Sequence, residues 1–288
     1  MEGLISTALI GVSIGAQYAM LSIGFTMVFG IMGVVNFAHG GGYLLGGYLA
    51  FFFAHFLGAP FALAVLLAAI STGVIGYFVE VTFVDKYIND PLATMIITLG
   101  LHMIIVTGVI QFFGPEPVEF RFPVSGALRW KGLYMSYANI IVLFICALAI
   151  ASMYYLIFRT RYGIALRAMA DNRAVAIAQG ILPSRMFPMA FALSMALAGL
   201  TGALVTPILV LEPGVGDSVL LKAFIVVILG GLGSVGGATI AAFVVGMVEA
   251  YSSVYLGSSR GTLLLFVVVI LILLVRPSGL MGREVRRA

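Results

Sequence analysis

Long stretches without a charged residue constrain this chain more than any other feature of its sequence. Residues 4–35 contain no Asp, Glu, Lys or Arg, and several further stretches of similar composition follow. Only 9% of the 288 residues are charged, whereas a soluble domain needs roughly a quarter to cover its surface. Since about 20 apolar residues cross a bilayer as a helix, the sequence predicts an all-α, polytopic membrane protein.

Polar interruptions divide the chain into eight or nine predicted membrane spans. The number depends on whether two short apolar pieces late in the chain both cross the membrane or form a re-entrant hairpin. The predicted ranges are 4–35, 43–57, 61–84, 91–114, 136–158, 186–211, 219–229, 238–256 and 261–275. We therefore expect residues 1–288 to form a single transmembrane domain, a helix bundle in lipid, with a longer loop at about 115–135.

The distribution of Lys and Arg predicts the orientation of these spans, because positive residues accumulate in cytoplasmic loops. With a cytoplasmic C-terminus, ten of the 15 basic residues fall on the cytoplasmic side, and the reverse orientation inverts that ratio. These ten are Lys86, Arg159, Arg161, Arg167, Arg173, Arg185, Arg276, Arg283, Arg286 and Arg287. We therefore expect the C-terminus inside and the 115–135 loop outside.

Several kinds of chemistry find no support in the sequence. No G-x-x-x-x-G-K-[ST] motif occurs, so the chain has no P-loop for ATP. One Cys and three dispersed His make no recognisable metal site. A G-x-G-x-x-G match at 231–236 lies between apolar pieces rather than after a strand, which argues against a dinucleotide site. Membrane topology accounts for the net charge of +4 without nucleic acid.

The segment 159–185 differs from everything around it. Four arginines lie among strong helix formers between residues 159 and 180, and Gly163 and Gly180 bracket most of that stretch. This composition predicts a short helix at the cytoplasmic surface between two spans. It is either a basic connection that only sets topology or a docking helix for a cytoplasmic partner. Its length of about 25 residues favours docking, since most connections are far shorter.

A second unusual stretch is the glycine cluster Gly230-Gly-Leu-Gly-Ser-Val-Gly-Gly237. Glycines between apolar pieces predict a helix break and close helix packing. Free backbone groups at such a break could also line a translocation path.

Polar residues inside apolar stretches are candidates for function, because charge in lipid is costly. Glu249 lies within 238–256, and Lys222 lies near the start of the preceding piece, so Glu249 is expected to pair or to act in transport. Glu80 lies about one turn from the end of its span and is expected to snorkel. Asn36 and His39 either face the bundle interior as satisfied polar groups or line a path.

Four blocks, in order, resemble one family along almost the whole chain. The first is G-F-T-M-V-F-G-I-M-G-V-V-N-F-A-H-G at 24–40, continuing into 43–50. The second is Y-G-I-A-L-R-A-M-A-D-N-R-A at 162–174 with Gly180, and the third is K-A-F at 222–224 with 230–238 and Glu249. The fourth is R-P-S-G-L-M-G at 276–282. Together they look like the permeases of branched-chain amino acid ATP-binding-cassette (ABC) importers.

This resemblance implies a permease subunit of a bacterial or archaeal cytoplasmic membrane, not an enzyme. It implies no cofactor in this chain, with ATP and Mg²⁺ held by partner subunits. The implied partners are two cytoplasmic ATP-binding subunits, a second, homologous permease subunit and an extracytoplasmic solute-binding protein. The cargo would be branched-chain amino acids or related small polar solutes.

The resemblance also suggests where the coupling and translocation residues lie. The expected ATPase-coupling residues are Gly163, Arg167, Ala168, Asp171, Asn172, Arg173 and Gly180. The expected pathway or hinge residues are Asn36, His39, Gly40, Gly46, Gly230, Gly231, Gly233, Ser234 and Glu249. Glycine breaks at 40–47 and 230–237 are expected to act as hinges or lining. The alternative is a self-contained secondary transporter or channel, in which the basic surface helix would have no role.

Overall fold

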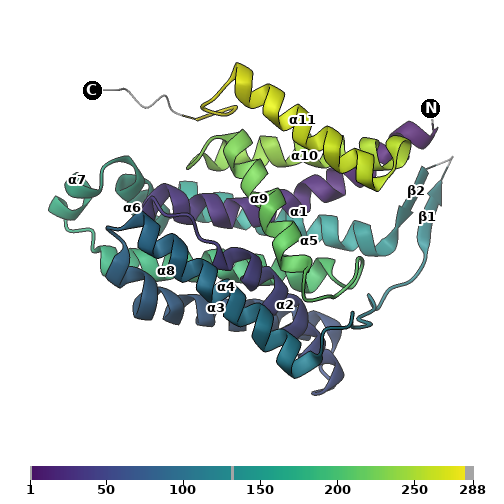
Figure 1. Ribbon diagram of the computed structural model, residues 1–288, viewed down its shortest axis with the longest axis horizontal. Helices are drawn as coiled ribbons and strands as arrows, with labels where there is room; N and C mark the ends of the chain where they lie inside the picture. The colour runs from purple at the N-terminus through teal and green to yellow at the C-terminus, as the bar shows by residue number, and fades with distance from the viewer. Residues whose placement is uncertain (1, 131–132, 283–288) are drawn as a thin grey trace. The chain divides into compact units, whose positions relative to one another are not determined.

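The computed structural model describes residues 2–130 and 133–282, and helices make up most of it (Figure 1). The long helices are α1 (Glu2–Met32), α2 (Ala38–His55), α3 (Phe61–Val79), α4 (Pro91–Phe113), α5 (Tyr137–Arg159), α8 (Pro183–Val205), α9 (Val215–Gly230), α10 (Val235–Leu256) and α11 (Ser258–Val275). The short elements are the π-helical η1 (Glu80–Val84), the 3₁₀ turn η2 (Asp85–Tyr87), α6 (Arg161–Asp171), α7 (Arg173–Ala178), β1 (Ala127–Trp130) and β2 (Leu133–Ser136). The expected all-α membrane class is confirmed.

The number of long apolar helices is lower than the eight or nine predicted spans. Within the described residues, six helices are long and apolar enough to cross a membrane, and Arg260–Val275 is a shorter apolar helix. The six are Gly3–Met32, Phe61–Tyr87, Pro91–Phe113, Tyr137–Arg159, Pro183–Val205 and Val235–Leu256. The α9 helix has 16 residues, which at 1.5 Å per residue is about 24 Å, less than the roughly 30 Å hydrocarbon layer. The α2 helix has five glycines and two histidines and is not among the six.

The chain divides into two compact units. One contains residues 1–26, 122–150 and 222–288, and the other contains 27–121 and 151–221. The boundaries fall inside α1, α5 and α9, so each of these helices contributes residues to both units. A single domain over 1–288 stays a prediction.

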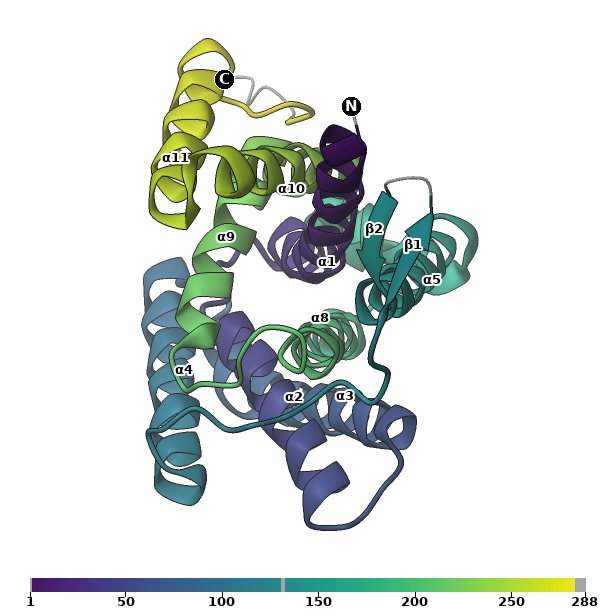
Figure 2. The same ribbon diagram turned by 90° about the vertical axis from the view of Figure 1, so that its right-hand side faces the viewer.

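In the second unit, α2, α3 and α8 pack against one another and α4 packs against α2 (Figure 2). Glycines allow the backbones to approach closely. A Cβ on Gly46 would collide with the backbone of Gly199 in α8, and one on Gly202 would collide with the carbonyl of Tyr43. Small residues at such crossings are the usual means of association between helices in lipid.

The predicted glycine break at 40–47 is wrong, because α2 is continuous from residue 38 to 55. The break lies earlier, at 33–37, where Gly33 has φ +69° and the backbone leaves the helix. Gly40 and Gly46 are helical, and neighbouring backbone fills the space that a side chain would need, at Gly216 and Gly199 respectively. Close packing rather than flexibility therefore explains these glycines.

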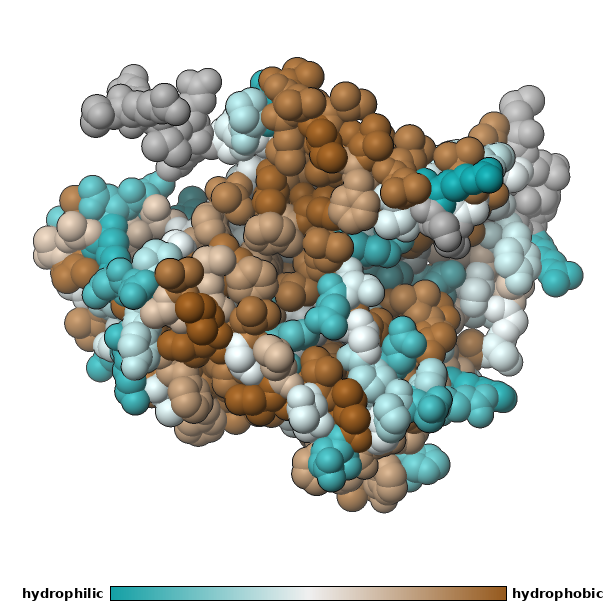
Figure 3. Space-filling view, viewed as in Figure 1, coloured by the Kyte–Doolittle hydropathy of each residue, from teal (hydrophilic) through white to brown (hydrophobic). Residues whose placement is uncertain are grey.

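In the first unit, apolar side chains of α1, α9, α10 and α11 form one core. Its buried members are Tyr18, Ala19, Ile225, Val226, Leu229, Ala241, Ala242, Val245, Leu265 and Val269. Gly246 of α10 lies against the backbone of Gly11 and Gly15, a G-x-x-x-G pair on α1. The exposed face of α11 is apolar (Figure 3), with Leu274 and Val275 among its most exposed side chains.

The predicted loop at 115–135 contains a hairpin that the sequence analysis did not foresee. Strands β1 and β2 are antiparallel, with Ala127 opposite Ser136 and Arg129 opposite Tyr134. The Tyr134 N–H donates to Ser6 Oγ near the start of α1, at 3.2 Å. Figure 1 shows the hairpin close to this end of α1.

Candidate coupling surface and intramembrane polar sites

The basic segment between α5 and α8 folds as two short capped helices instead of the one helix predicted. Thr160 caps α6 by accepting a hydrogen bond from Gly163 N at 3.1 Å. Asn172 ends α6 and begins α7, where its side chain accepts from Val175 N at 3.1 Å. Asn172 has φ −156° and ψ 99°, so the helix cannot continue through it. Gly180, with φ +86°, follows α7.

The buried face of this segment holds it against the protein. Gly163, Leu166, Met169 and Ala176 are buried. A Cβ on Gly163 would collide with the carbonyls of Leu156 and Ile157, so only glycine allows α6 to fold back over the end of α5. The Tyr162 hydroxyl donates to Met186 O at 3.2 Å, and burial raises the pKa of this phenol, which keeps it a donor.

The opposite face is exposed and carries both charge and apolar surface. Arg167 and Asp171 are exposed there, as are Ile164, Val175 and Ile177. Hydrophilic side chains gather over α6 and α7 in Figure 3. This mixture of an exposed basic group and unpartnered aliphatic side chains is typical of a surface that binds another protein.

The two candidate arginines differ in their surroundings. Arg173 is half-buried, lies 5.0 Å over the ring of Phe187 and donates to Asn89 Oδ1 at 3.4 Å. Arg167 is exposed and contacts the ring of Phe158 at 5.3 Å. Both guanidinium groups therefore lie over an aromatic ring, but Arg173 has a further hydrogen bond and is half-buried, whereas Arg167 is exposed. Ala168 is half-buried on α6.

A polar cluster lies at the α1–α2 break, within the second unit. Thr94, Thr98 and His102 are buried along one side of α4, one turn apart. Thr98 Oγ1 accepts from Phe37 N at 3.2 Å, inside the break. Asn36 is buried, its Oδ1 accepts from Ala38 N at 3.0 Å, and its Nδ2 has no partner among the described residues.

The same cluster contains a His–Asp pair. His102 Nε2 and Asp217 Oδ1, at the start of α9, are 2.6 Å apart. The His102 side chain is 5% exposed, whereas that of Asp217 is 67% exposed. Gly41 lies against the His102 ring, since a Cβ there would be 3.2 Å from Nδ1. Of the predicted pathway residues, Asn36, Gly40 and His39 lie near this point in the fold, and His39 Nδ1 and Ser194 Oγ are 3.2 Å apart.

Glu249 forms an ion pair in the first unit, which is one of the two roles expected for it. Lys222 Nζ donates to Glu249 Oε1 at 2.6 Å, and the Tyr18 hydroxyl donates to Oε2 at 2.6 Å. The Lys222 ammonium also lies 5.7 Å from the centre of the Tyr18 ring. These contacts join α1, α9 and α10, so pairing satisfies the charge that Glu249 brings into an apolar helix.

The glycine cluster at 230–237 forms the predicted helix break between α9 and α10. Gly231 and Gly233 have φ +98° and +82°, and Ser234 caps α10 by accepting from Gly237 N. The 276–282 segment covers this break, with Leu280 N donating to Leu229 O at 2.7 Å and Met281 N to Gly230 O at 3.1 Å. The third sequence block, at 230–238, therefore contacts the fourth, at 276–282. A pathway role for these glycines stays a prediction.

Glu80 does not snorkel as expected. It is fully buried at the start of η1, and neither carboxyl oxygen has a hydrogen-bond partner among the described residues. The π-helical turn rotates the residues after Glu80 relative to α3, which the sequence pattern of a regular helix does not predict.

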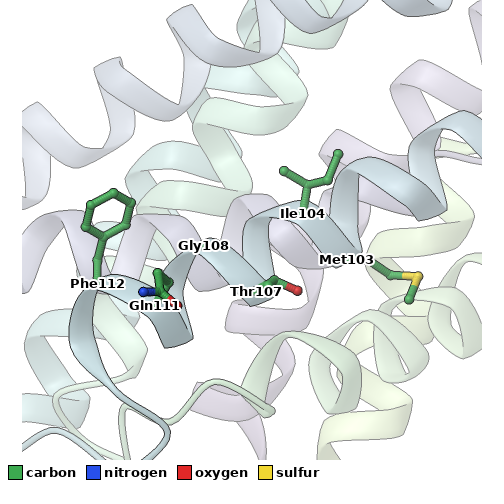
Figure 4. Close-up of a pocket in the computed structure, with 6 residues that line it drawn as sticks. All are labelled: Met103, Ile104, Thr107, Gly108, Gln111 and Phe112. Atoms are coloured by element: carbon green, nitrogen blue, oxygen red, sulfur yellow. The ribbon is translucent and has the colours of Figure 1, made fainter.

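A shallow depression of about 430 Å³ lies on α4 alone (Figure 4). It is lined by Met103, Ile104, Thr107, Gly108, Gln111 and Phe112. At about 100° per residue, these side chains lie on the side of α4 roughly opposite His102, so the depression is separate from the polar cluster. No group of three or more potential metal ligands occurs among residues 2–130 and 133–282.

The sequence analysis overlooked Asp217 and Thr98. The signal for Thr98 was the spacing of Thr94, Thr98 and His102 at intervals of four residues in an apolar span, which places them on one helix face. Asp217 had a weaker signal, as an isolated acid just before an apolar piece, and nothing in the sequence connects it with His102, 115 residues away.

Comparison with known proteins identifies the family. A family model described as "Branched-chain amino acid transport system / permease component" matches residues 7–275. The chain belongs to this family. BraD of Pseudomonas aeruginosa, named a high-affinity branched-chain amino acid transport system permease protein, is 31% identical and the match covers 95% of this chain and 94% of BraD.

Two further relatives carry similar names. LivH of Escherichia coli K12 is 30% identical, with 95% of this chain and 94% of LivH covered. LivM of Salmonella typhimurium is 25% identical, with 92% of this chain and 67% of LivM covered. No solved structure gives a significant match. The family, together with the six long apolar helices, makes this chain a multi-pass membrane permease.

Proposed function

We propose that this chain is the membrane-spanning permease subunit of an ATP-driven importer for branched-chain amino acids or related small polar solutes. The family match over residues 7–275 carries the proposal, because it extends through every spanning helix and through the segment between α5 and α8. Both LivH and LivM, which bear the name of one transport system, resemble this chain. A second, homologous permease subunit is accordingly the partner within the membrane.

The α6–α7 segment is the proposed docking surface for cytoplasmic ATP-binding subunits. Gly163 packs against the carbonyls at the end of α5, and Tyr162 and Arg173 contact residues of α8, so a force applied to the segment would reach both helices. Its exposed face presents Arg167 beside Ile164 and Asp171, a charged and apolar patch that fits a groove on a partner. ATP and Mg²⁺ would be bound by those subunits and not by this chain.

The orientation follows from this assignment. If α6 and α7 face the cytoplasm, the positive-inside rule places the C-terminus inside and the hairpin-bearing 115–135 loop outside. An extracytoplasmic solute-binding protein would then deliver the solute from the hairpin side. The protein would lie in the cytoplasmic membrane of a bacterium or archaeon.

Arg167→Glu tests the docking surface. A charge-assisted contact contributes roughly 1.5–3 kcal/mol, so reversing the charge should weaken association with the ATP-binding subunits by about tenfold or more. Solute uptake should fall in parallel. The measurement is co-purification from native membranes through a tag on this chain, with uptake of labelled leucine by the same cells.

Arg121→Glu is the matched control, because Arg121 is an exposed arginine in the loop expected to lie outside. It should leave co-purification of the ATP-binding subunits unchanged. If Arg167→Glu behaves like this control, the docking assignment is wrong, although membership of the permease family is unaffected.

A further inference from the structure

We propose that Asp217, held in place by His102, binds the protonated amine of the transported solute inside the membrane. This inference rests on the proposed import function and assigns the recognition of one chemical group to one side chain. The observation behind it is the His102–Asp217 contact of 2.6 Å, in which one partner is buried and the other is mostly exposed.

The position of the pair places Asp217 deep in the membrane. His102 is the twelfth of the 23 residues of α4, which is one of the six long apolar helices. At 1.5 Å per residue, each end of α4 is about 16 Å away along the helix axis. The Asp217 carboxylate, in contact with His102, therefore lies at the depth of the middle of α4.

A carboxylate exposed at this depth is incompatible with a lipid environment. An acidic side chain at the centre of a spanning helix costs about 2.5–3.5 kcal/mol even on the most lenient scale. Such residues accordingly face a water-filled cavity or a binding partner. Because 67% of the Asp217 side chain is exposed, its free surface is available to a ligand that carries positive charge.

The neighbouring groups match a small molecule with both a donor and an acceptor. The second ring nitrogen of His102, Nδ1, is buried and has no hydrogen-bond partner among the described residues. Asn36 Nδ2, in the same cluster, is a buried donor with no acceptor among residues 2–130 and 133–282. Buried polar groups are rarely left unpaired unless a ligand, water or ion meets them. A zwitterionic amino acid supplies an ammonium donor and a carboxylate acceptor.

The backbone supports a solute site at this point. The α1–α2 break at 33–37 and the irregular stretch 206–214 before α9 both end here, and Gly40 and Gly216 are in contact. Membrane transporters bind their solutes near the midplane where helices are interrupted, because interrupted helices free backbone groups for binding. Asp217 thus adds an acidic side chain at a place where the regular helices are interrupted.

The test compares solutes with and without an amine. The complex of this chain with its partner subunits is purified in detergent, without the delivery protein, and its binding of labelled L-leucine is measured. Competition with 4-methylpentanoate, which is leucine without its amine, gives the affinity for this compound. The ratio of the leucine affinity to this affinity is the preference for leucine. In Asp217→Asn, leucine affinity should fall about tenfold, the loss expected for one charge-assisted contact, whereas the affinity for 4-methylpentanoate should not change.

Two further variants make the test specific. Asp217→Glu keeps the charge and should recover part of the preference for leucine. Glu116→Gln neutralises an exposed loop carboxyl in the same unit and should leave the preference unchanged. All variants must elute as intact complexes on size-exclusion chromatography before binding is compared.

Two outcomes overturn the inference. The first is an unchanged leucine preference in Asp217→Asn. The second is release of the second permease subunit by Asp217→Asn, which would make Asp217 a subunit contact. ATP-driven leucine uptake by vesicles that contain the unmodified complex, with ATP and the delivery protein supplied, is measured in parallel and separates the two proposals. Uptake together with an unchanged preference refutes only the role of Asp217, whereas absence of uptake by the unmodified complex refutes the proposed function.

Discussion

At the scale of single residues, Glu80 is the least expected side chain in the structure. It is fully buried, neither of its carboxyl oxygens has a partner in the part of the chain that the structure describes, and it begins a π-helical turn at the end of α3. Burying an ionised carboxylate without a partner is far more costly than burying a neutral group. π-helical turns occur frequently at functional sites, and they persist despite their poorer geometry.

We predict that Glu80→Gln does not destabilise the protein and raises its apparent melting temperature. Glutamine keeps the shape of the side chain but cannot carry the charge that burial disfavours. The measurement is thermal unfolding of the purified protein in detergent, with Glu116→Gln, at an exposed loop position, as control. A lower melting temperature for Glu80→Gln would show that the carboxylate is stabilised by a partner outside the described residues.

At the scale of elements, charged side chains in apolar helices connect one helix to another. Lys222, Glu249 and Tyr18 come from α9, α10 and α1, and two hydrogen bonds of 2.6 Å join them. Lys222 is 30% and Glu249 21% exposed, so solvent or headgroups screen the pair only in part. The pair satisfies two charges that would otherwise be separately desolvated.

We predict that Glu249→Gln destabilises the protein by about 2 kcal/mol, because Lys222 is left half-buried without its counter-charge. Replacing both charges, in Lys222→Met with Glu249→Leu, should recover most of this loss, since apolar replacements of buried pairs are often neutral. Melting temperatures of the single and double variants provide the measurement. If the double variant is as unstable as the single one, the hydrogen bond from Tyr18, and not the ion pair, holds the three helices together.

At the scale of the whole molecule, the carboxylate that the sequence offered to a self-contained carrier is already engaged. Such a carrier requires an ionisable group that couples solute movement to an ion gradient, and such groups lie within the membrane. Glu249, the carboxylate that the sequence offered for this role, is already paired with Lys222 and Tyr18. The exposed α6–α7 surface, by contrast, has no role without a partner.

We predict that the purified chain, reconstituted alone into lipid vesicles, does not transport leucine under a proton or sodium gradient. Vesicles containing the complete complex should take up leucine only when ATP and the delivery protein are supplied. Radiolabelled uptake in both preparations, with empty vesicles as control, gives the comparison. Gradient-driven uptake by the chain alone would establish a secondary transporter instead.

Much of the architecture followed from the sequence, because lipid imposes simple requirements. A helix must be apolar over about 20 residues, and polar stretches must leave the membrane, so the spans and the basic connection were recognisable without coordinates. The glycine cluster at 230–237 was likewise predictable as a break, since glycine repeatedly interrupts or closely packs helices in membranes. Shorter helices such as α9 were harder, because 16 apolar residues are compatible with several placements.

Tertiary structure alone decided which polar groups meet. The glycines of α2 turned out to be packing contacts with Gly199 and Gly216, and the break moved to 33–37. Asp217 acquired its significance only through His102, 115 residues away in the sequence. Helix rotation and the pairing of distant side chains depend on packing between segments, which residue spacing within one segment does not encode. The sequence by itself therefore determined a membrane permease, and the packing of its helices decided where that permease could recognise a solute.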